Sequence, residues 1–304
     1  MSAARDNAMQ DDVLEILPSS LDDTAPPFSA ERAPDGVSER IVVRRPAGLP
    51  GVDLWVMRST NRRFRHITEG YWFSRAGPRT LHRARAENRY RGNALEVVGD
   101  DVALLDPNEA IINTRSSGHL DMVNLCLAPA YIQQVLGVTA IPHFANFTPS
   151  DPTLSSLLWA ANRAVAEPAT DLLEREARLT ELVVHAFAHH GERPPPLDTG
   201  SDSSLTRARE LLEDRYAETL RLDDIASHAR ISKYHLERKF RAHFGVPLHQ
   251  YLKLVRVRRA MERLRYGEPL SAVATEVGFS DQAHMTRTFR QVMGITPGAY
   301  RRGG

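Results

Sequence analysis

Apolar and polar positions alternate with two different periods along this chain. Between Ile41 and about Leu127 the apolar residues form short runs with β-strand character, separated by turn residues such as Gly99-Asp100. From about Pro152 onward apolar residues recur at the spacing of an α-helix. Short strands followed by helices predict an α+β multidomain chain that begins with a small β-sandwich or β-barrel. The predicted strands cover Ile41-Val42-Val43, Val52–Val56, Glu69–Phe73, Ala94–Val98 and Asp101–Leu105.

Two amphipathic helices are predicted over residues 151–190. Their apolar stripes leave two alternatives open: the helices close the barrel domain of residues 41–150, or they form a subunit interface, because the second stripe has near-heptad spacing. The first stripe contains Leu154, Leu157, Leu158, Ala161 and Val165, and the second contains Leu172, Leu179, Leu182, Val183, Ala186 and Phe187.

Two stretches have the composition of connecting segments. Residues 1–40 are rich in Asp, Ser, Pro and Ala and predict a flexible lead-in. Residues 191–203 contain three consecutive prolines and predict a linker and domain boundary. His189 and His190 precede this linker, and we interpret them as solvated residues at a helix end, because adjacent helical positions face different directions.

Composition excludes several classes of protein. Of the 304 residues 42% are hydrophobic, which suffices for a core, and the single cysteine, Cys126, excludes an internal disulfide framework. No apolar run reaches the length of a membrane span, and the acidic N-terminus does not resemble a secretory signal, so we expect a cytoplasmic protein. Residues 1–200 carry 26 acidic and 20 basic side chains, whereas residues 201–304 carry 12 and 19. The basic third predicts a polyanionic partner.

An internal repeat in the last hundred residues indicates what that partner is. Leu222–Ser232 matches Leu270–Ser280 at an offset of 48, and the match resumes at 49 after one extra residue. Each copy predicts a short helix with a closely packed alanine, a turn, a serine N-cap and a second helix, which together form a helix-turn-helix. The turn holds Gly278 in one copy and Arg230 in the other, and only glycine adopts positive φ without strain. Leu236, Phe240, Met285 and Phe289 are predicted core residues.

A long helix is predicted between the two copies, from Pro247 to Tyr266-Gly267. At about 20 residues it spans about 30 Å, close to the roughly 34–36 Å of one turn of B-DNA. Two second helices on such a spacer would enter successive major grooves. We interpret the basic residues of the spacer as an outer face toward phosphates: Lys253, Arg256, Arg258, Arg259, Arg263 and Arg265.

Residues 204–302 resemble the DNA-binding domain of the AraC/XylS family of transcription regulators. The resemblance rests on Ala274-x3-Gly278-Phe279-Ser280-Asp281-x3-Met285-x3-Phe289-Arg290-x3-Gly294-Ile295-Thr296-Pro297-x2-Tyr300-Arg301. It implies a double helix-turn-helix whose second helices read bases, with RNA polymerase as a further partner, a homodimer and activation of transcription. The implied DNA-binding residues are Lys233, Tyr234, Glu237, Arg238, Arg241 and Arg259, together with Asp281, Gln282, His284, Thr286 and Arg287.

The same resemblance implies a cupin-like sensor barrel over residues 41–150. Arg65-His66-Ile67-Thr68 supplies one histidine where a cupin metal site needs two, and Ile111-Ile112 supply none, so we expect no metal, no cofactor and no enzyme activity. An apolar interior is the candidate pocket for a small-molecule effector. Its candidate lining residues are Phe64, His66, Tyr71, Trp72, His82 and Tyr90.

The sequence therefore predicts a sequence-specific DNA-binding transcription regulator, an activator, controlled by a small molecule. The alternative is a DNA-binding regulator that responds to a protein partner or acts without an effector. The dense arginines of the N-terminal half fit either an anionic effector, a protein partner or a solvated surface. A small-molecule enzyme with an incidental basic tail does not explain the doubled helix-turn-helix.

Overall fold

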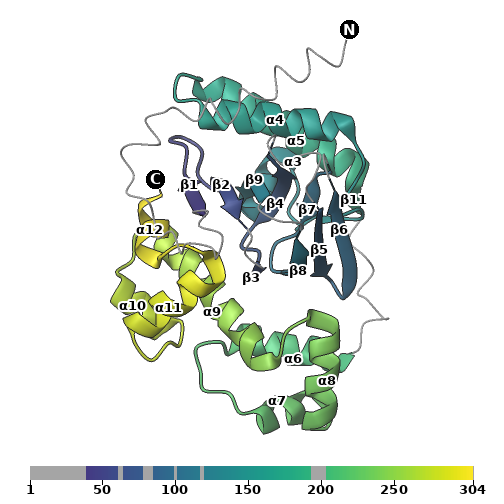
Figure 1. Cartoon of the computed structure of the whole chain (residues 1–304), viewed down its shortest axis with the longest axis vertical. Helices are drawn as coiled ribbons and strands as arrows, with labels where there is room; N and C mark the ends of the chain where they lie inside the picture. The colour runs from purple at the N-terminus through teal and green to yellow at the C-terminus, as the bar shows by residue number, and fades with distance from the viewer. Residues whose placement is uncertain are drawn as a thin grey trace.

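The computed structural model describes residues 39–60, 64–77, 85–98, 101–116, 120–192 and 203–303. They form a chain of mixed strands and helices, with two larger β-sheets, a two-stranded ladder and three covering helices in the first part and seven helices in the last (Figure 1). Most of the expected lead-in 1–40, most of the linker 191–203 and the candidate effector residue His82 lie outside the described residues.

The larger sheet has five antiparallel strands in the order β1-β2-β9-β4-β7. Four of them contain the apolar runs predicted from the sequence, and β9 contains buried Cys126, as expected of a small apolar residue. The edge strand β7 ends just before a turn at Pro107-Asn108. The strands cover Arg40–Arg44 (β1), Val52–Thr60 (β2), Tyr71–Ala76 (β4), Ala103–Leu105 (β7) and Leu120–Leu127 (β9).

The second sheet has the order β3-β8-β5-β6. Its strands are Arg65–Ile67 (β3), Arg85–Tyr90 (β5), Asn93–Val98 (β6) and Ala110–Ser116 (β8). Arg91 and Gly92 join β5 to β6 with φ of 48° and 76°, the positive pair of a type I′ hairpin turn. The barrel that the family resemblance implies is corrected here to two open sheets, the other alternative being the sandwich that the strand pattern allowed. A barrel needs every strand paired on both sides, whereas β3 and β7 have three residues each and pair on one side only.

Three helices cover the five-stranded sheet (Figure 1). Apolar side chains of the second and third share one buried cluster with the sheet, as the first of our two alternatives predicts. Leu173 and Val184 of the third helix stay exposed, so a subunit interface on that helix remains a prediction. The third helix is followed directly by β11 (Gly191–Glu192), which pairs with β10 (His143–Phe144) in a two-strand ladder. This ladder fixes the end of the third helix. The helices are α3 (Pro129–Leu136), α4 (Pro152–Ala166) and α5 (Leu172–His190).

The last hundred residues fold into helices, and among the helices that the structure describes none has the length and apolarity to cross a membrane. Two clusters of buried residues form their cores, and each cluster also contains residues of the sheets. The helices are α6 (Ser203–Asp214), α7 (Leu222–Ala229), α8 (Lys233–Phe244), α9 (Leu248–Arg265), α10 (Leu270–Glu276), α11 (Gln282–Met293) and α12 (Pro297–Arg302).

The two turns inside the repeats adopt the same left-handed backbone. Arg230 has φ 57° and Gly278 has φ 85°. A Cβ at Gly278 would lie 2.6 Å from the carbonyl oxygen of Ala217, which is too close for any side chain. Glycine is therefore required in the second repeat for two reasons, whereas Arg230 tolerates the strain in open space.

We expect Gly278→Ala to lower the free energy of unfolding by more than the roughly 1–2 kcal/mol that left-handed backbone costs an L-residue. Gly267→Ala is the matched control, because Gly267 has φ 83° but no atom within 4 Å of the position of a Cβ. Denaturant unfolding of both variants measures the difference. Equal losses would contradict the close approach to Ala217.

Candidate nucleic-acid interface

The first helix-turn-helix unit consists of α7 and α8. Ser232 caps α8, with its hydroxyl oxygen accepting the N–H of His235, as the sequence predicts. Leu236 and Phe240 are fully buried and pack with Ala226 of α7 in one core. Because these apolar positions face inward, the remaining face of α8 turns outward.

The second unit consists of α10 and α11 and repeats this packing. Ala274, Met285 and Phe289 are fully buried. The expected cap is corrected by one residue: Asp281, not Ser280, caps α11, and its Oδ1 accepts the N–H of His284 at 2.7 Å. The carboxylate is the stronger acceptor for an orphan N–H at the positive end of a helix, and the hydroxyl of Ser280 donates to its second oxygen.

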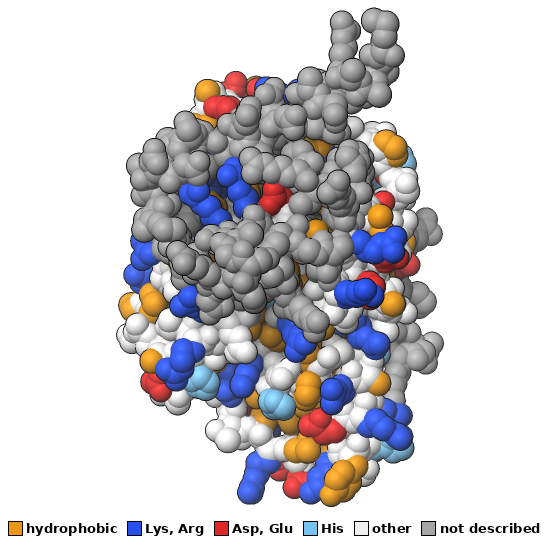
Figure 2. Space-filling model, viewed as in Figure 1, with side chains coloured by type: hydrophobic (Ala, Val, Ile, Leu, Met, Phe, Trp, Pro, Cys, Tyr) orange, Lys and Arg blue, Asp and Glu red, His pale blue; other side chains and the backbone are white. Residues whose placement is uncertain are grey.

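The candidate base-reading side chains of α8 lie on its outer face. Tyr234 is 80% exposed, and Arg238 and Arg241 are exposed. Arg238 contacts the ring of His235 at 2.9 Å. Lys233 and Glu237 are half-buried, and Lys233 pairs with Asp223 of α7 at 3.1 Å. On the part of the surface in Figure 2 where Figure 1 places α6 to α8, Lys and Arg side chains are interspersed with apolar, acidic and histidine side chains.

On α11 the candidates divide between exposed and half-buried positions. Gln282 and Arg287 are exposed, whereas His284 and Thr286 are half-buried. Hydrogen bonds, first among them the N–H of His284, lower the pKa of Asp281, so its charge is fixed beside the helix N-terminus. The structure thus gives Asp281 a capping role in addition to the predicted contact with DNA.

The basic residues of α9 do not form the open phosphate-facing surface that the sequence predicts. Arg258 is 3% exposed and bonds to Glu213 of α6, to Glu262, and to Asn108 in the loop before β8. Arg265 bonds to Asp53 of β2 at 2.6 Å. The spacing of arginines in the sequence predicts which face of a helix they occupy. It does not predict which carboxylates of other elements will pair with them.

The other arginines of α9 are engaged to different degrees. Arg256 donates to the backbone oxygens of Tyr216 and Glu218, and Arg263 pairs with Glu268 and Glu276. Lys253 is exposed. Arg259 contacts Glu262 at 3.2 Å and Glu213 at 3.9 Å, and its side chain keeps 33% of its exposure.

Further contacts join the DNA-binding helices to the sheets. Tyr300 of α12 is fully buried against Trp55 of β2, with ring centroids 5.8 Å apart, and the guanidinium of Arg45 lies over the Tyr300 ring. In the first unit, Arg89 of β5 donates to the backbone oxygen of Ala242 at the end of α8. Both helix-turn-helix units therefore pack directly on the sheets.

A pocket lies between the two sheets. Three of the predicted effector residues, Phe64, His66 and Trp72, line it, together with Asn113 and Asn124, which sequence reasoning missed. Burial lowers the pKa of His66 to about 4, so its ring is neutral at neutral pH. No Asp, Glu, Lys or Arg lines this pocket within the described chain.

Two other candidate effector residues, Tyr71 and Tyr90, lie elsewhere. Tyr71 is buried beneath the covering helices, where its hydroxyl donates to the backbone oxygen of Pro142. Tyr90 is buried beside Phe147, and its hydroxyl oxygen accepts the N–H of Asp106. Tyr71 points away from the pocket because neighbouring residues of a strand point to opposite faces of the sheet. Trp72, the next residue of β4, faces the pocket.

The chain resembles known DNA-binding regulators in these helices. Residues 225–303 match the model of a helix-turn-helix domain. The chain is 33% identical to the HTH-type transcriptional activator AarP of Providencia stuartii over 91 residues, 30% of this chain and 67% of AarP. It is 32% identical to the uncharacterized HTH-type transcriptional regulator YfiF of Bacillus subtilis over 155 residues, 48% of this chain, and spans about half, 49%, of YfiF.

A solved structure is also similar to part of the chain. The AraC-type transcriptional regulator from Chromobacterium violaceum is 32% identical, and the match covers 34% of this chain and 94% of that protein, with a TM-score of 0.33.

Arg258→Ala should destabilise the chain by about 3 kcal/mol, because it removes the buried cation that bonds to Glu213 and leaves that half-buried carboxylate only the longer contact with Arg259, at 3.9 Å. Lys253→Ala, an exposed cation on the same helix, is the control and should stay within about 0.5 kcal/mol of the unaltered chain. Denaturant unfolding monitored by far-UV circular dichroism measures both. A cost for Arg258→Ala no larger than that of the control would show that the pairing carries no net stability.

Proposed function

The chain belongs to the AraC/XylS family of DNA-binding transcription regulators, and from that premise we propose that α8 and α11 read base edges in two successive major grooves. It is a regulator and not an enzyme, as its relatives are named. The observation that carries the proposal is the doubled arrangement of one buried and one outward face on these two helices.

The outward side chains have the chemistry of base recognition. Arginine bonds guanine bidentately, glutamine bonds adenine and glutamate accepts from cytosine. We assign base contacts to Arg238 and Arg287 first, because each is exposed in the middle of its helix. The next candidates for base contacts are Gln282, Glu237 and Tyr234. His284 and Thr286 are half-buried and therefore less accessible to DNA. The carboxylate of Asp281 already accepts a hydrogen bond as the cap of α11.

The spacer between the units supports this reading. α9 has 18 residues and is therefore about 27 Å long, somewhat less than one turn of B-DNA at roughly 34–36 Å. We assign phosphate contacts to Lys233 and Arg241 at the flank of α8 and to the exposed third of Arg259. These contacts supply salt-dependent affinity that does not depend on sequence.

Control by a small molecule is the second part of the proposal. Three polar atoms of the pocket, Trp72 Nε1, His66 Nε2 and Asn124 Nδ2, are buried without a hydrogen-bond partner. Buried polar groups are rarely left unpaired. A ligand that supplies acceptor oxygens would satisfy the two N–H donors, Trp72 Nε1 and Asn124 Nδ2. We propose an uncharged effector with an apolar body and a carbonyl or hydroxyl group, bound in what we regard as a cupin-like sensor of residues 41–150.

The remaining parts follow from the family. We propose a cytoplasmic homodimer that contacts RNA polymerase and activates transcription, with the exposed Leu173 and Val184 of the helical pair 151–190 at the subunit interface. The effector acts by changing the contacts of the sheets with α9. A regulator controlled by a protein partner, or one without an effector, is the alternative.

Arg287→Ala should relax the preference at one base pair of the target, at a cost of about 1–3 kcal/mol in specific binding. Arg221→Ala, an exposed arginine outside α8 and α11, is the control and should leave the preference unchanged. Binding to a panel of single-base variants of the selected site measures both. Equal weakening on every sequence would assign Arg287 to a phosphate.

Leu95→Trp fills the pocket and should abolish thermal stabilisation by an effector from a library of uncharged apolar metabolites. Leu95 lines the pocket, whereas Val98 of the same strand does not, so Val98→Trp is the control and should keep the stabilisation. Thermal denaturation with and without each compound provides the readout. If no compound stabilises the unaltered chain, the alternative of a protein partner is favoured.

A further inference from the structure

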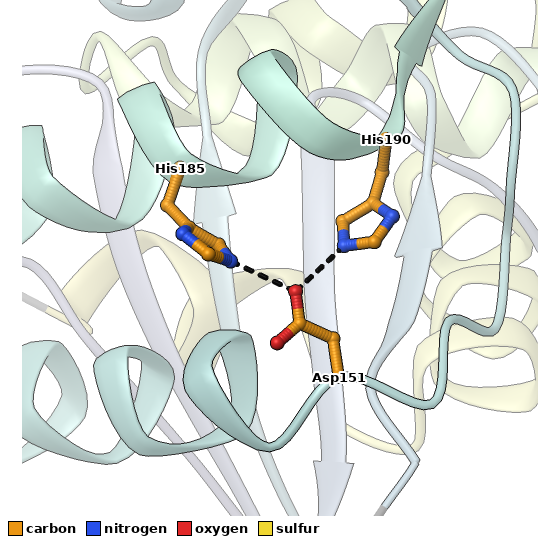
Figure 3. Close-up of side chains that lie close together, drawn as sticks. All are labelled: Asp151, His185 and His190. Atoms are coloured by element: carbon orange, nitrogen blue, oxygen red, sulfur yellow. Dashed lines mark hydrogen bonds and ion pairs between the residues drawn. The ribbon is translucent and has the colours of Figure 1, made fainter.

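A cluster of two histidines and one aspartate lies at the edge of the helical pair. Asp151 precedes α4, His190 ends α5, and His185 lies five residues before it (Figure 3). Nε2 of His185 and Nε2 of His190 lie 2.8 and 2.9 Å from the same oxygen of Asp151. This corrects the interpretation of His190 as a solvated residue, since its side chain is 13% exposed, whereas His189 is exposed as expected.

We propose that Asp151, His185 and His190 bind a divalent first-row transition metal ion of the zinc class. Two imidazoles and one carboxylate are ligands that such ions favour, and three protein ligands leave a fourth position for water or another donor. The three ligand atoms lie within 4.8 Å of one another. A tetrahedral ion with bonds of about 2 Å needs them about 3.3 Å apart, so the two short contacts open by about half an ångström.

The surroundings hold the ligands in place. The second carboxylate oxygen of Asp151 accepts the N–H of Leu154 at 3.0 Å, which fixes the orientation of the carboxylate. The ring of His189 stacks on that of His185, with centroids 4.3 Å apart. The backbone oxygen of His190 accepts the N–H of Ala145 from the β10 segment. Such supporting contacts orient the ligands of metal sites in proteins.

The charge of the cluster suits a cation. Burial acts to raise the pKa of Asp151, but the hydrogen bonds from Leu154, His185 and His190 outweigh it and hold this pKa well below its usual value. The carboxylate is therefore ionised at neutral pH and offers a negative charge to a bound cation.

A bound ion would join the start of α4 to the end of α5. The last residue of α5 leads into β11, whose partner β10 is anchored by the N–H of Phe144, which donates to Asp106. Asp106 in turn pairs with Arg91 at 2.7 Å, at the hairpin turn of the second sheet. Metal binding would thus rigidify the end of α5 and the adjoining ladder.

The test is a titration of the chelator-treated full chain with Zn²⁺ by isothermal calorimetry, with thermal denaturation in parallel. We expect one equivalent to bind and the melting temperature to rise. His190→Ala and Asp151→Asn should each weaken binding by at least about 10- to 100-fold. Asp151→Asn keeps an acceptor oxygen for the cap of α4, and far-UV circular dichroism checks its fold.

His228→Ala is the control, because His228 is exposed on α7, far along the chain from the cluster, and its loss should leave the affinity unchanged. Co²⁺ bound to the unaltered chain should give the visible spectrum of a tetrahedral nitrogen and oxygen site. The proposal is overturned if the unaltered chain binds no stoichiometric Zn²⁺, or if the ligand variants bind it as tightly as His228→Ala does.

Discussion

Arg258 is the contact on which the arrangement of the DNA-binding half depends. Its guanidinium is buried where α9, α6 and the loop before β8 meet, and it bonds to Glu213 and Asn108. A buried guanidinium is costly unless its charge is paired, and Arg258 bonds through its two terminal nitrogens, whereas its Nε has no hydrogen-bond partner within the described chain. Arg258 therefore fixes the helix between the two units against both its own domain and the sheets.

Together with other contacts, Arg258 packs the sheets and the DNA-binding helices against each other. Apolar residues of the sheets share buried clusters with each helix-turn-helix unit, and Arg265 of α9 adds an ion pair to Asp53 of β2. The pocket with its three unpaired polar atoms lies between the same sheets. A ligand that shifts the sheets would change the position of α9 relative to them. We propose that effector binding alters the DNA-binding surface in this way.

The local parts of this structure could be predicted from the sequence, whereas the contacts between distant segments could not. Periodicity predicted the helices of the repeat, and Leu236, Phe240, Met285 and Phe289 are buried as expected. The apolar runs predicted β1, β2, β4, β6 and β7. They did not predict that the sheets stay open, which follows from the short pairing of β3 and β7, each over three residues and with one neighbouring strand. The pairing of α9 arginines with carboxylates, and of His190 with Asp151, joins residues far apart along the chain. Sequence spacing carries no signal for such pairs.

The measurement that tests the central claim most directly is selection of genomic fragments by the full chain at near-physiological salt, followed by footprinting. The account predicts selective binding with two protected major-groove segments about one helical turn, roughly 34–36 Å, apart on one face of the duplex. Binding that does not discriminate among sequences, with or without added small molecules, would contradict it.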